Sequence, residues 1–143
     1  MKKYIYCVFT VLTLTTLNSA AFAKTWGAGA VFGAPTGISA SYYLKEDRVV
    51  HSTLAYNLDG KSNLEIASHY EWRKNFRNLN WFYGAGAKAT FNDFKAGPSG
   101  SLGAFHDFKE APVEIFLKSA LTLNIISKTD SDLDLMLGIH YLF

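Results

Sequence analysis

Apolar and polar residues alternate along most of the chain, and the alternation is clearest near its C-terminal end. Every second residue there is apolar: Leu133, Leu135, Leu137, Ile139, Tyr141 and Phe143. Successive side chains of a β-strand point to opposite faces. The segment therefore predicts a strand with one apolar face and one polar face.

Eight such segments follow one another after Lys24: residues 25–33, 37–45, 49–58, 64–73, 81–91, 100–107, 113–124 and 133–143. Turn-forming residues separate several of them, at 34–36, 46–48, 59–63, 92–98 and 127–132. Helical periodicity is weak throughout. The pattern predicts an all-β protein with eight antiparallel strands and short connections, in which the sixth segment does not fix which face its residues take.

The two faces differ sharply in chemistry. In the third and fourth segments one face carries Val50, Leu54, Tyr56, Leu58, Leu64, Ile66, Tyr70 and Trp72, and the other carries His51, Thr53, Asn57, Glu65, His69, Glu71 and Arg73. The seventh segment sets Val113, Ile115, Leu117, Leu121 and Leu123 against Glu114, Lys118 and Thr122. Alternation alone does not say which of the two faces is inside.

The N-terminal residues decide between these arrangements. Lys2 and Lys3 precede an apolar, threonine-rich run, and Ala21-Phe22-Ala23 forms a small-x-small cleavage site. The run is too short for the roughly 18–20 apolar residues of a membrane helix. We therefore predict a signal peptide at 1–23 and a mature domain at 24–143. Together with the terminal Phe143, the leader favours export toward a membrane and a transmembrane β-barrel after a cleaved signal peptide, with its apolar face toward lipid.

Composition argues against several classes of function. Cys7 is the only cysteine and lies in the predicted leader, so the mature chain has no disulfide or thiol chemistry. The chain has 14 basic and 12 acidic residues, and Lys2 and Lys3 belong to the leader. The mature chain is thus formally neutral and shows no basic stripe, which argues against nucleic-acid binding.

Aromatic and small residues also have places in such a barrel. Two aromatic girdles are expected, with Trp26, Trp72, Trp81, Tyr83, Tyr141 and Phe143 at the periplasmic side and Phe32, Tyr56 and Phe91 at the other. Glycines on an inward face would make room for large neighbours there. The glycines expected inside are Gly27, Gly29, Gly33, Gly84 and Gly86, and the large neighbours are Phe82, Phe116 and Met136.

Several local motifs resemble those of known proteins. They are Gly33-Ala34-Pro35-Thr36-Gly37, Tyr83-Gly84-Ala85-Gly86, Pro112-Val113-Glu114-Ile115-Phe116 and the ending from Gly138 to Phe143. The chain resembles the small eight-stranded outer-membrane barrels of Gram-negative bacteria, the group of OmpX and the OmpA transmembrane domain, and more closely a family of short-loop barrels. The resemblance implies an outer-membrane location, insertion by the barrel-assembly machinery, and a C-terminal sorting signal in Tyr141 and Phe143. The short connections argue against an adhesin role.

Ionisable residues on the predicted inward face form the main chemical constellation: Glu65, His69, Glu71, Lys88, Glu114, Lys118, Asp134 and His140. Charges in a lumen without bulk water must be paired. We expect a salt-bridged network that holds the barrel closed. A narrow proton or water path through His69 and its neighbouring carboxylates is the functional alternative.

Enzymatic and metal chemistry find little support. His51-Ser52 and Ser68-His69 are sequence neighbours, so each pair points to opposite faces of its strand. The four histidines, His51, His69, His106 and His140, lack metal-ligand spacing. We expect no enzyme, no catalytic residue, no metal and no cofactor.

One basic cluster, Arg73, Lys74 and Arg77 with Phe76, follows the fourth segment. It is expected in a periplasmic turn, where it could meet anionic headgroups or a partner, or be an ordinary solvated turn. The expected role of the whole chain is structural or membrane-organising. Binding of a lipid or protein partner is the alternative, a narrow channel or lipid-modifying enzyme the third, and the oligomeric state stays open.

Overall fold

A computed structural model describes residues 24–57, 63–127 and 129–143. These residues form eight strands: β1 (Trp26–Ala34), β2 (Thr36–Lys45), β3 (Arg48–Asn57), β4 (Asn63–Phe76), β5 (Leu79–Thr90), β6 (Lys95–Asp107), β7 (Val113–Asn124) and β8 (Asp130–Leu142). The predicted signal peptide at 1–23 and most of the predicted turn at 59–63 lie outside the described residues. The described residues include no helix long and apolar enough to cross a membrane.

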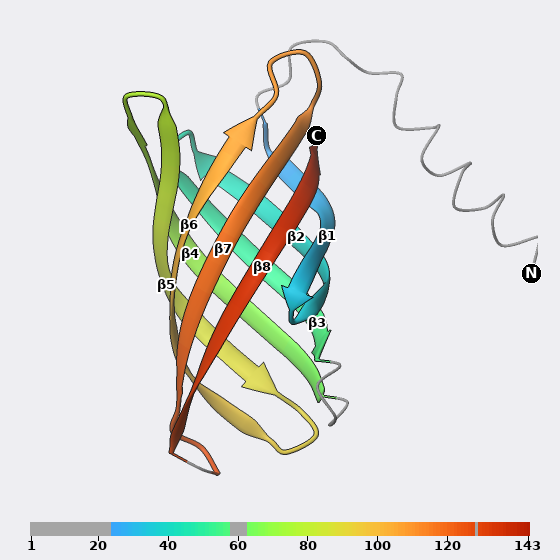
Figure 1. The fold of residues 1–143 in the computed structure, drawn as a ribbon, viewed down its shortest axis with the longest axis vertical. Coiled ribbons are helices and arrows are strands. Elements are labelled where there is room, and N and C mark those ends of the chain that lie inside the picture. The colour runs from blue at the N-terminus through green and yellow to red at the C-terminus, as the bar shows by residue number, and fades with distance from the viewer. Residues whose placement is uncertain (1–23, 58–62, 128) are drawn as a thin grey trace, which may run out of the picture.

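The strands form a closed antiparallel barrel in which each strand pairs with its sequence neighbour (Figure 1). β8 closes the ring on β1, with Tyr141 opposite Ala28 and Leu137 opposite Phe32. Lys24, Phe143 and the β2–β3, β4–β5 and β6–β7 connections share one end, called here the terminus end. The opposite end, with Pro35 and the β5–β6 turn, is called the turn end. The prediction of an all-β, eight-stranded antiparallel barrel is confirmed.

The first turn shows why its residues suit it. Gly33 has a φ of 138°, a region that residues with a Cβ rarely adopt, and the Ala34–Pro35 peptide bond is cis. The Thr36 hydroxyl accepts a hydrogen bond from the Gly33 N–H at 3.2 Å and donates one to its carbonyl at 3.0 Å. The side chain thus takes over backbone hydrogen bonds that a one-residue connection cannot form.

Strand ends differ from the prediction in three places. β4 and β5 run on to Phe76 and Leu79, because the hairpin stays paired up to that point. The predicted break at 92–98 is too long, since β6 begins at Lys95 and includes Pro98. Pro98 lies just before the β6–β7 ladder starts at Ser99, where a missing N–H is tolerated. β8 begins at Asp130, inside the predicted break at 127–132.

The structure also settles the face of the sixth strand. Ser99, Ser101, Gly103 and Phe105 alternate with the outward residues Gly100 and Leu102. Inside the barrel, Val31, Phe82, Phe116 and Met136 form an apolar cluster, and Phe105 packs against it. A Cβ at Gly103 would collide with the Phe82 ring, and one at Gly138 with the Phe116 ring. These two glycines, which were not among the five predicted, make room for the phenylalanine rings, whereas the predicted Gly84 makes room for Ser101 and Glu71.

Candidate functional site

The interior of the barrel holds most of its chemistry. Among the described residues, three cations and four carboxylates are buried: Arg73, Lys88 and Lys118, and Glu65, Glu71, Glu114 and Asp134. His51, His69 and His140 are buried with them. The inward faces of β3, β4, β5, β7 and β8 supply these side chains, because residues of equal parity on a strand share a face.

Near the terminus end, Arg73 and Glu114 form a two-pronged ion pair. Arg73 Nη2 donates to Glu114 Oε1 at 2.9 Å, and Nη1 donates to Oε2. The Tyr43 hydroxyl donates to Glu114 Oε2 at 3.2 Å. The guanidinium carbon lies 5.0 Å from the centre of the Tyr43 ring and 4.2 Å from that of Phe105. Aromatic rings and a carboxylate thus stabilise one buried cation together.

This position of Arg73 corrects its grouping with Lys74 and Arg77 in a basic turn that would meet headgroups, a partner or solvent. Arg73 is only 7% exposed and points inward. It lies on the same face of β4 as Glu65, His69 and Glu71, as its position in the alternating fourth segment predicts.

A second ion pair lies deeper. Lys118 Nζ donates to Glu71 Oε1 at 2.6 Å, and both side chains are almost fully buried. His51 Nδ1 lies 3.6 Å from Glu71 Oε2. The His51 ring packs edge-on against Phe116, with centroids 4.9 Å apart. His51 therefore connects the ion pair with the apolar cluster.

Two histidines make three contacts with serines inside the barrel, none of which was predicted from the sequence. Ser39 Oγ and His140 Nε2 are hydrogen-bonded at 2.6 Å, and Ser41 Oγ lies 3.3 Å from His140 Nδ1. His69 Nε2 and Ser99 Oγ are bonded at 2.9 Å. The inward face of Ser39 and Ser41 follows from parity in the second segment. The face of Ser99, and the height along the barrel axis at which these serines meet a histidine, do not follow from the sequence.

The serine–histidine pairs considered from the sequence behave as parity requires. Ser52 and Ser68 point outward and bond to each other at 3.0 Å, while His51 and His69 are buried in the interior. Ser39 and Ser99 are themselves only 5% exposed. Neither lines either of the two vestibules of the barrel. Their hydrogen bonds satisfy buried polar atoms.

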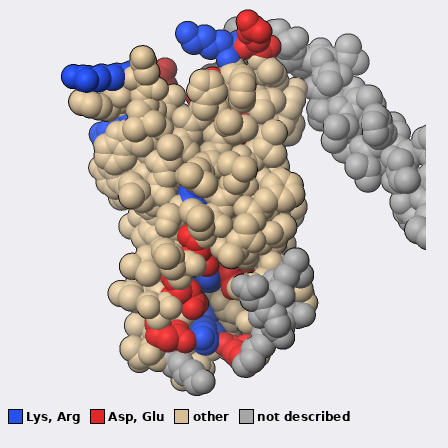
Figure 2. All heavy atoms as spheres, viewed as in Figure 1, with Lys and Arg blue, Asp and Glu red and all other residues tan. Residues whose placement is uncertain are grey.

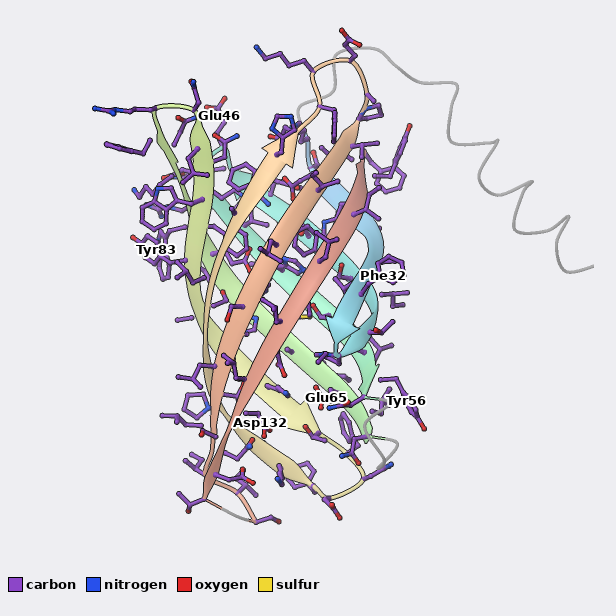
Figure 3. The ribbon with its side chains drawn as sticks, in the orientation of Figure 1. Phe32, Glu46, Tyr56, Glu65, Tyr83 and Asp132 are labelled. Carbon is purple, nitrogen blue, oxygen red and sulfur yellow. The ribbon has the colours of Figure 1, made fainter. Side chains whose placement is uncertain are left out.

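At the turn end, Lys88 bridges two carboxylates across the barrel. Its Nζ lies 2.9 Å from Asp134 and 3.0 Å from Glu65. Asn124 Nδ2 donates to Asp130 at 2.7 Å and to Asp132 at 2.9 Å. Lys95 Nζ pairs with Asp130 at 2.6 Å. Glu65 and Asp132 lie close to this opening in Figure 3.

Each end of the barrel opens into a vestibule. The one at the turn end has a volume of about 340 Å³ and is lined by Glu65, Lys88, Asp132 and Asp134 among others. The one at the terminus end has about 880 Å³, with Arg73, Tyr43 and Phe105 in its lining. The two share no lining residue. The apolar cluster and the Glu71–Lys118 pair lie in the interior between them.

The eight ionisable residues predicted for the inward face are therefore all buried in the interior. Glu71 meets Lys118, and Lys88 meets Glu65 and Asp134, whereas Glu114 pairs with Arg73, which was not among the eight. His140 and His69 bond to serines. In the part of the chain that the structure describes, no three His, Cys, Asp or Glu residues are placed to hold a metal ion.

The outer wall has the opposite composition. Large apolar side chains are exposed there along every strand: Trp26, Phe32, Ile38, Tyr42, Leu54, Tyr56, Leu64, Ile66, Tyr83, Leu102, Ile115, Leu117, Leu121, Leu133, Leu135, Leu137 and Ile139. The visible wall in Figure 2 is mostly uncharged, and charged atoms gather at the two ends and in the opening toward the turn end. Figure 3 shows Tyr83 high on the wall and Tyr56 near the turn end, with Phe32 between these levels because β1 is short.

The fold and site thus define a closed eight-stranded barrel with a charged, ion-paired interior and an apolar exterior. No protein-family model matches the chain, no curated protein is significantly similar to it, and no solved structure matches it.

Proposed function

We propose that this chain is an integral outer-membrane barrel protein with a structural or membrane-organising role. One observation carries the proposal: charged side chains point inward and apolar side chains point outward. Leu117 is 51% exposed whereas its neighbour Lys118 is 1% exposed. Exposing apolar area to water costs a free energy of about 25 cal/mol per Å². A wall of this composition is stable when hydrocarbon replaces water around it.

The distribution of aromatic residues supports the same proposal. Trp72 stacks on Tyr83 at 5.5 Å, Trp26 packs on Tyr42 at 4.6 Å, and Tyr141 packs on Phe143 at 5.1 Å, all toward the terminus end. Phe91 and Phe94 pack together at the turn end. Trp and Tyr favour the boundary between headgroups and acyl chains. The leader-like pattern of residues 1–23 supports export, with the barrel-assembly machinery as partner during insertion.

The interior favours a structural role over transport. Each of the three buried cations among the described residues is paired with a carboxylate. A two-pronged contact such as Arg73–Glu114 is strong, so that opening a path through the interior would be costly. The apolar cluster separates the two vestibules. Binding of a lipid or protein partner through the outer wall is the second candidate, supported by the uneven distribution of charge on the turns. A narrow channel or a lipid-modifying enzyme ranks third.

Membrane fractionation with gel mobility tests the location and the fold together. The expressed chain should fractionate with outer membranes, and unheated protein should migrate differently from heated protein because a folded barrel resists detergent. Recovery in the soluble periplasmic fraction would overturn the proposal.

Thiol labelling tests the orientation. The predicted mature chain has no cysteine, so Asn75→Cys in the β4–β5 hairpin gives a single site. This site should resist an impermeant thiol reagent in intact cells and react once the outer membrane is permeabilised. Asp93→Cys, in the β5–β6 turn at the opposite end, is the matched control and should react in intact cells. The reverse result would invert the orientation.

Conductance separates a plug from a channel. In planar bilayers, the purified chain should give no openings above background. Openings that Lys118→Ala abolishes would show that the interior conducts and would overturn the structural role.

A further inference from the structure

The β4–β5 hairpin combines aromatic side chains on its outward face with basic side chains that have no carboxylate partner among the described residues. Beyond Trp72, which lies opposite the first residue of β3, Arg48, β4 continues to pair with β5 up to Phe76 opposite Leu79, while β5 also pairs with β6 as far as Asn80 opposite Phe105. Asn75 Nδ2 donates to Asn80 Oδ1 at 2.6 Å. The hairpin lies at the terminus end of the barrel, as the β6–β7 connection does (Figure 1).

The outward face of the hairpin continues the aromatic wall. Trp72 contacts Tyr70 at 4.9 Å and Tyr83 at 5.5 Å, and Tyr83 contacts Trp81 at 5.7 Å. Lys74 lies directly opposite Trp81, one outward position beyond Trp72. Toward the tip, Phe76 is 65% exposed and Leu79 is 57% exposed. Aromatic rings, a lysine and two apolar side chains thus follow one another along a single face.

The charge of this hairpin is uncompensated. No acidic residue occurs between Glu71 and Asp93 in the sequence. Among the described residues no carboxylate pairs with Lys74 or Arg77, and the Arg77 guanidinium lies 5.5 Å from the Phe76 ring. Arg73 is occupied inside by Glu114.

The neighbouring turns at the same end are different. Arg48 lies 3.9 Å from Asp47 in the β2–β3 turn, and Lys24 pairs with Asp107 at 3.0 Å. Lys109 is followed directly by Glu110 in the β6–β7 connection. Of the three connections at this end, only the β4–β5 hairpin carries basic residues without an acidic neighbour, and it lies next to the largest aromatic cluster on the wall.

We propose that the β4–β5 hairpin and the wall beneath it form a binding site for the headgroup of an anionic phospholipid. Lys74 and Arg77 would bind the lipid phosphate, while Trp72, Trp81 and Tyr83 pack against the glycerol and upper acyl region. Phe76 and Leu79 cover the headgroup from the tip. The site rests on the proposed function, because it requires a bilayer around the wall.

The test uses the tryptophans of the site as reporters. The chain has three tryptophans, so Trp26→Phe leaves only Trp72 and Trp81. This variant is placed in nanodiscs that contain a small, equal fraction of either brominated phosphatidylglycerol or brominated phosphatidylcholine. We expect phosphatidylglycerol to quench the fluorescence with an apparent association about fivefold stronger, as two surface cations allow. Raising the salt to about 0.5 M should remove the preference by screening.

Two double variants in the same background identify the residues. Lys74→Gln with Arg77→Gln should abolish the preference. Lys45→Gln with Lys109→Gln removes the same charge from exposed positions at the same end and should leave the preference intact. An equal loss in both variants would reduce the effect to net charge and overturn the site. Soluble glycerol phosphate should not compete, since competition would show that a free phosphate suffices and would overturn a lipid site.

The readout separates this inference from the proposed function. Quenching by brominated phosphatidylcholine reports that the wall lies in the bilayer, whatever the headgroup preference. Its absence would overturn the membrane proposal. Quenching without any preference for phosphatidylglycerol would overturn the lipid site alone and would favour a protein partner for the hairpin.

Discussion

The interior and the outer wall of this barrel are made from the same strands but are stabilised in different ways. On β7, Lys118 is buried against Glu71, and the adjacent Leu117 faces outward. Inside, stability depends on specific partners, because a buried charge without its partner is costly. Outside, it depends on the surrounding medium, because the apolar wall has no protein partner in this chain. Substitutions on the two sides should therefore fail for different reasons.

The largest effect should come from breaking an interior ion pair. Lys118→Met leaves Glu71 buried without its cation, which should lower the free energy of unfolding by about 3–5 kcal/mol. Urea unfolding of the refolded barrel in lipid vesicles measures it. The double variant with Glu71→Gln should recover much of the loss, and Lys109→Met, an exposed cation, should change little. A single variant as stable as the starting chain would show that the pair does not stabilise the interior.

On the outer wall, introducing a charge should itself destabilise the barrel. Leu117→Arg near the middle of the barrel should cost about 2–4 kcal/mol in vesicles, because the guanidinium enters hydrocarbon. Leu133→Arg, near the turn end of β8, should cost only about 0–1 kcal/mol because it lies close to an interface. Equal costs at both positions, from the same unfolding measurement, would contradict a depth-dependent lipid environment.

The two regions also differ in how far the sequence predicts them. Parity in the alternating segments assigned the wall and the inward faces of β3, β4 and β7 correctly, because the period of a strand is fixed by its backbone. Parity gave no information on the height of each side chain along the barrel axis. Ser39 and His140 meet although 101 residues separate them, and Lys88 on β5 reaches Asp134 on β8. Such pairs depend on strand register and stagger around the ring.

The strand ends and the face of the sixth strand were harder to predict, because they too depend on pairing between strands. The extra length of β4 and β5 comes from cross-strand pairing, such as Asn75 with Asn80, that no single segment reveals. Turn-forming composition at 92–98 suggested a longer break, yet β6 pairs with β5 from Lys95 onward. Tertiary pairing overrides local propensity at these positions.

Glycine substitutions give a smaller test of the same contrast. A Cβ at the inward Gly138 would overlap the Phe116 ring, so Gly138→Ala should cost about 1–3 kcal/mol of unfolding free energy. The outward Gly100 has its nearest atom 3.8 Å from the added Cβ. Gly100→Ala should be neutral or stabilise by up to about 0.5 kcal/mol. If both substitutions were neutral, the interior would be more loosely packed than the structure indicates.

The smallest effects should come from serine substitutions, which remove one partner of a hydrogen bond in the interior and both partners on the wall. Ser39→Ala removes the partner of His140 Nε2 in the closed interior, which should cost about 1–2 kcal/mol because a buried polar atom then lacks a hydrogen bond. On the wall, Ser52 and Ser68 bond only to each other at 3.0 Å. Replacing both with alanine removes donor and acceptor together and should leave the unfolding free energy nearly unchanged in vesicles. A costly double variant, with Ser39→Ala harmless, would mean that the wall rather than the interior depends on specific polar contacts.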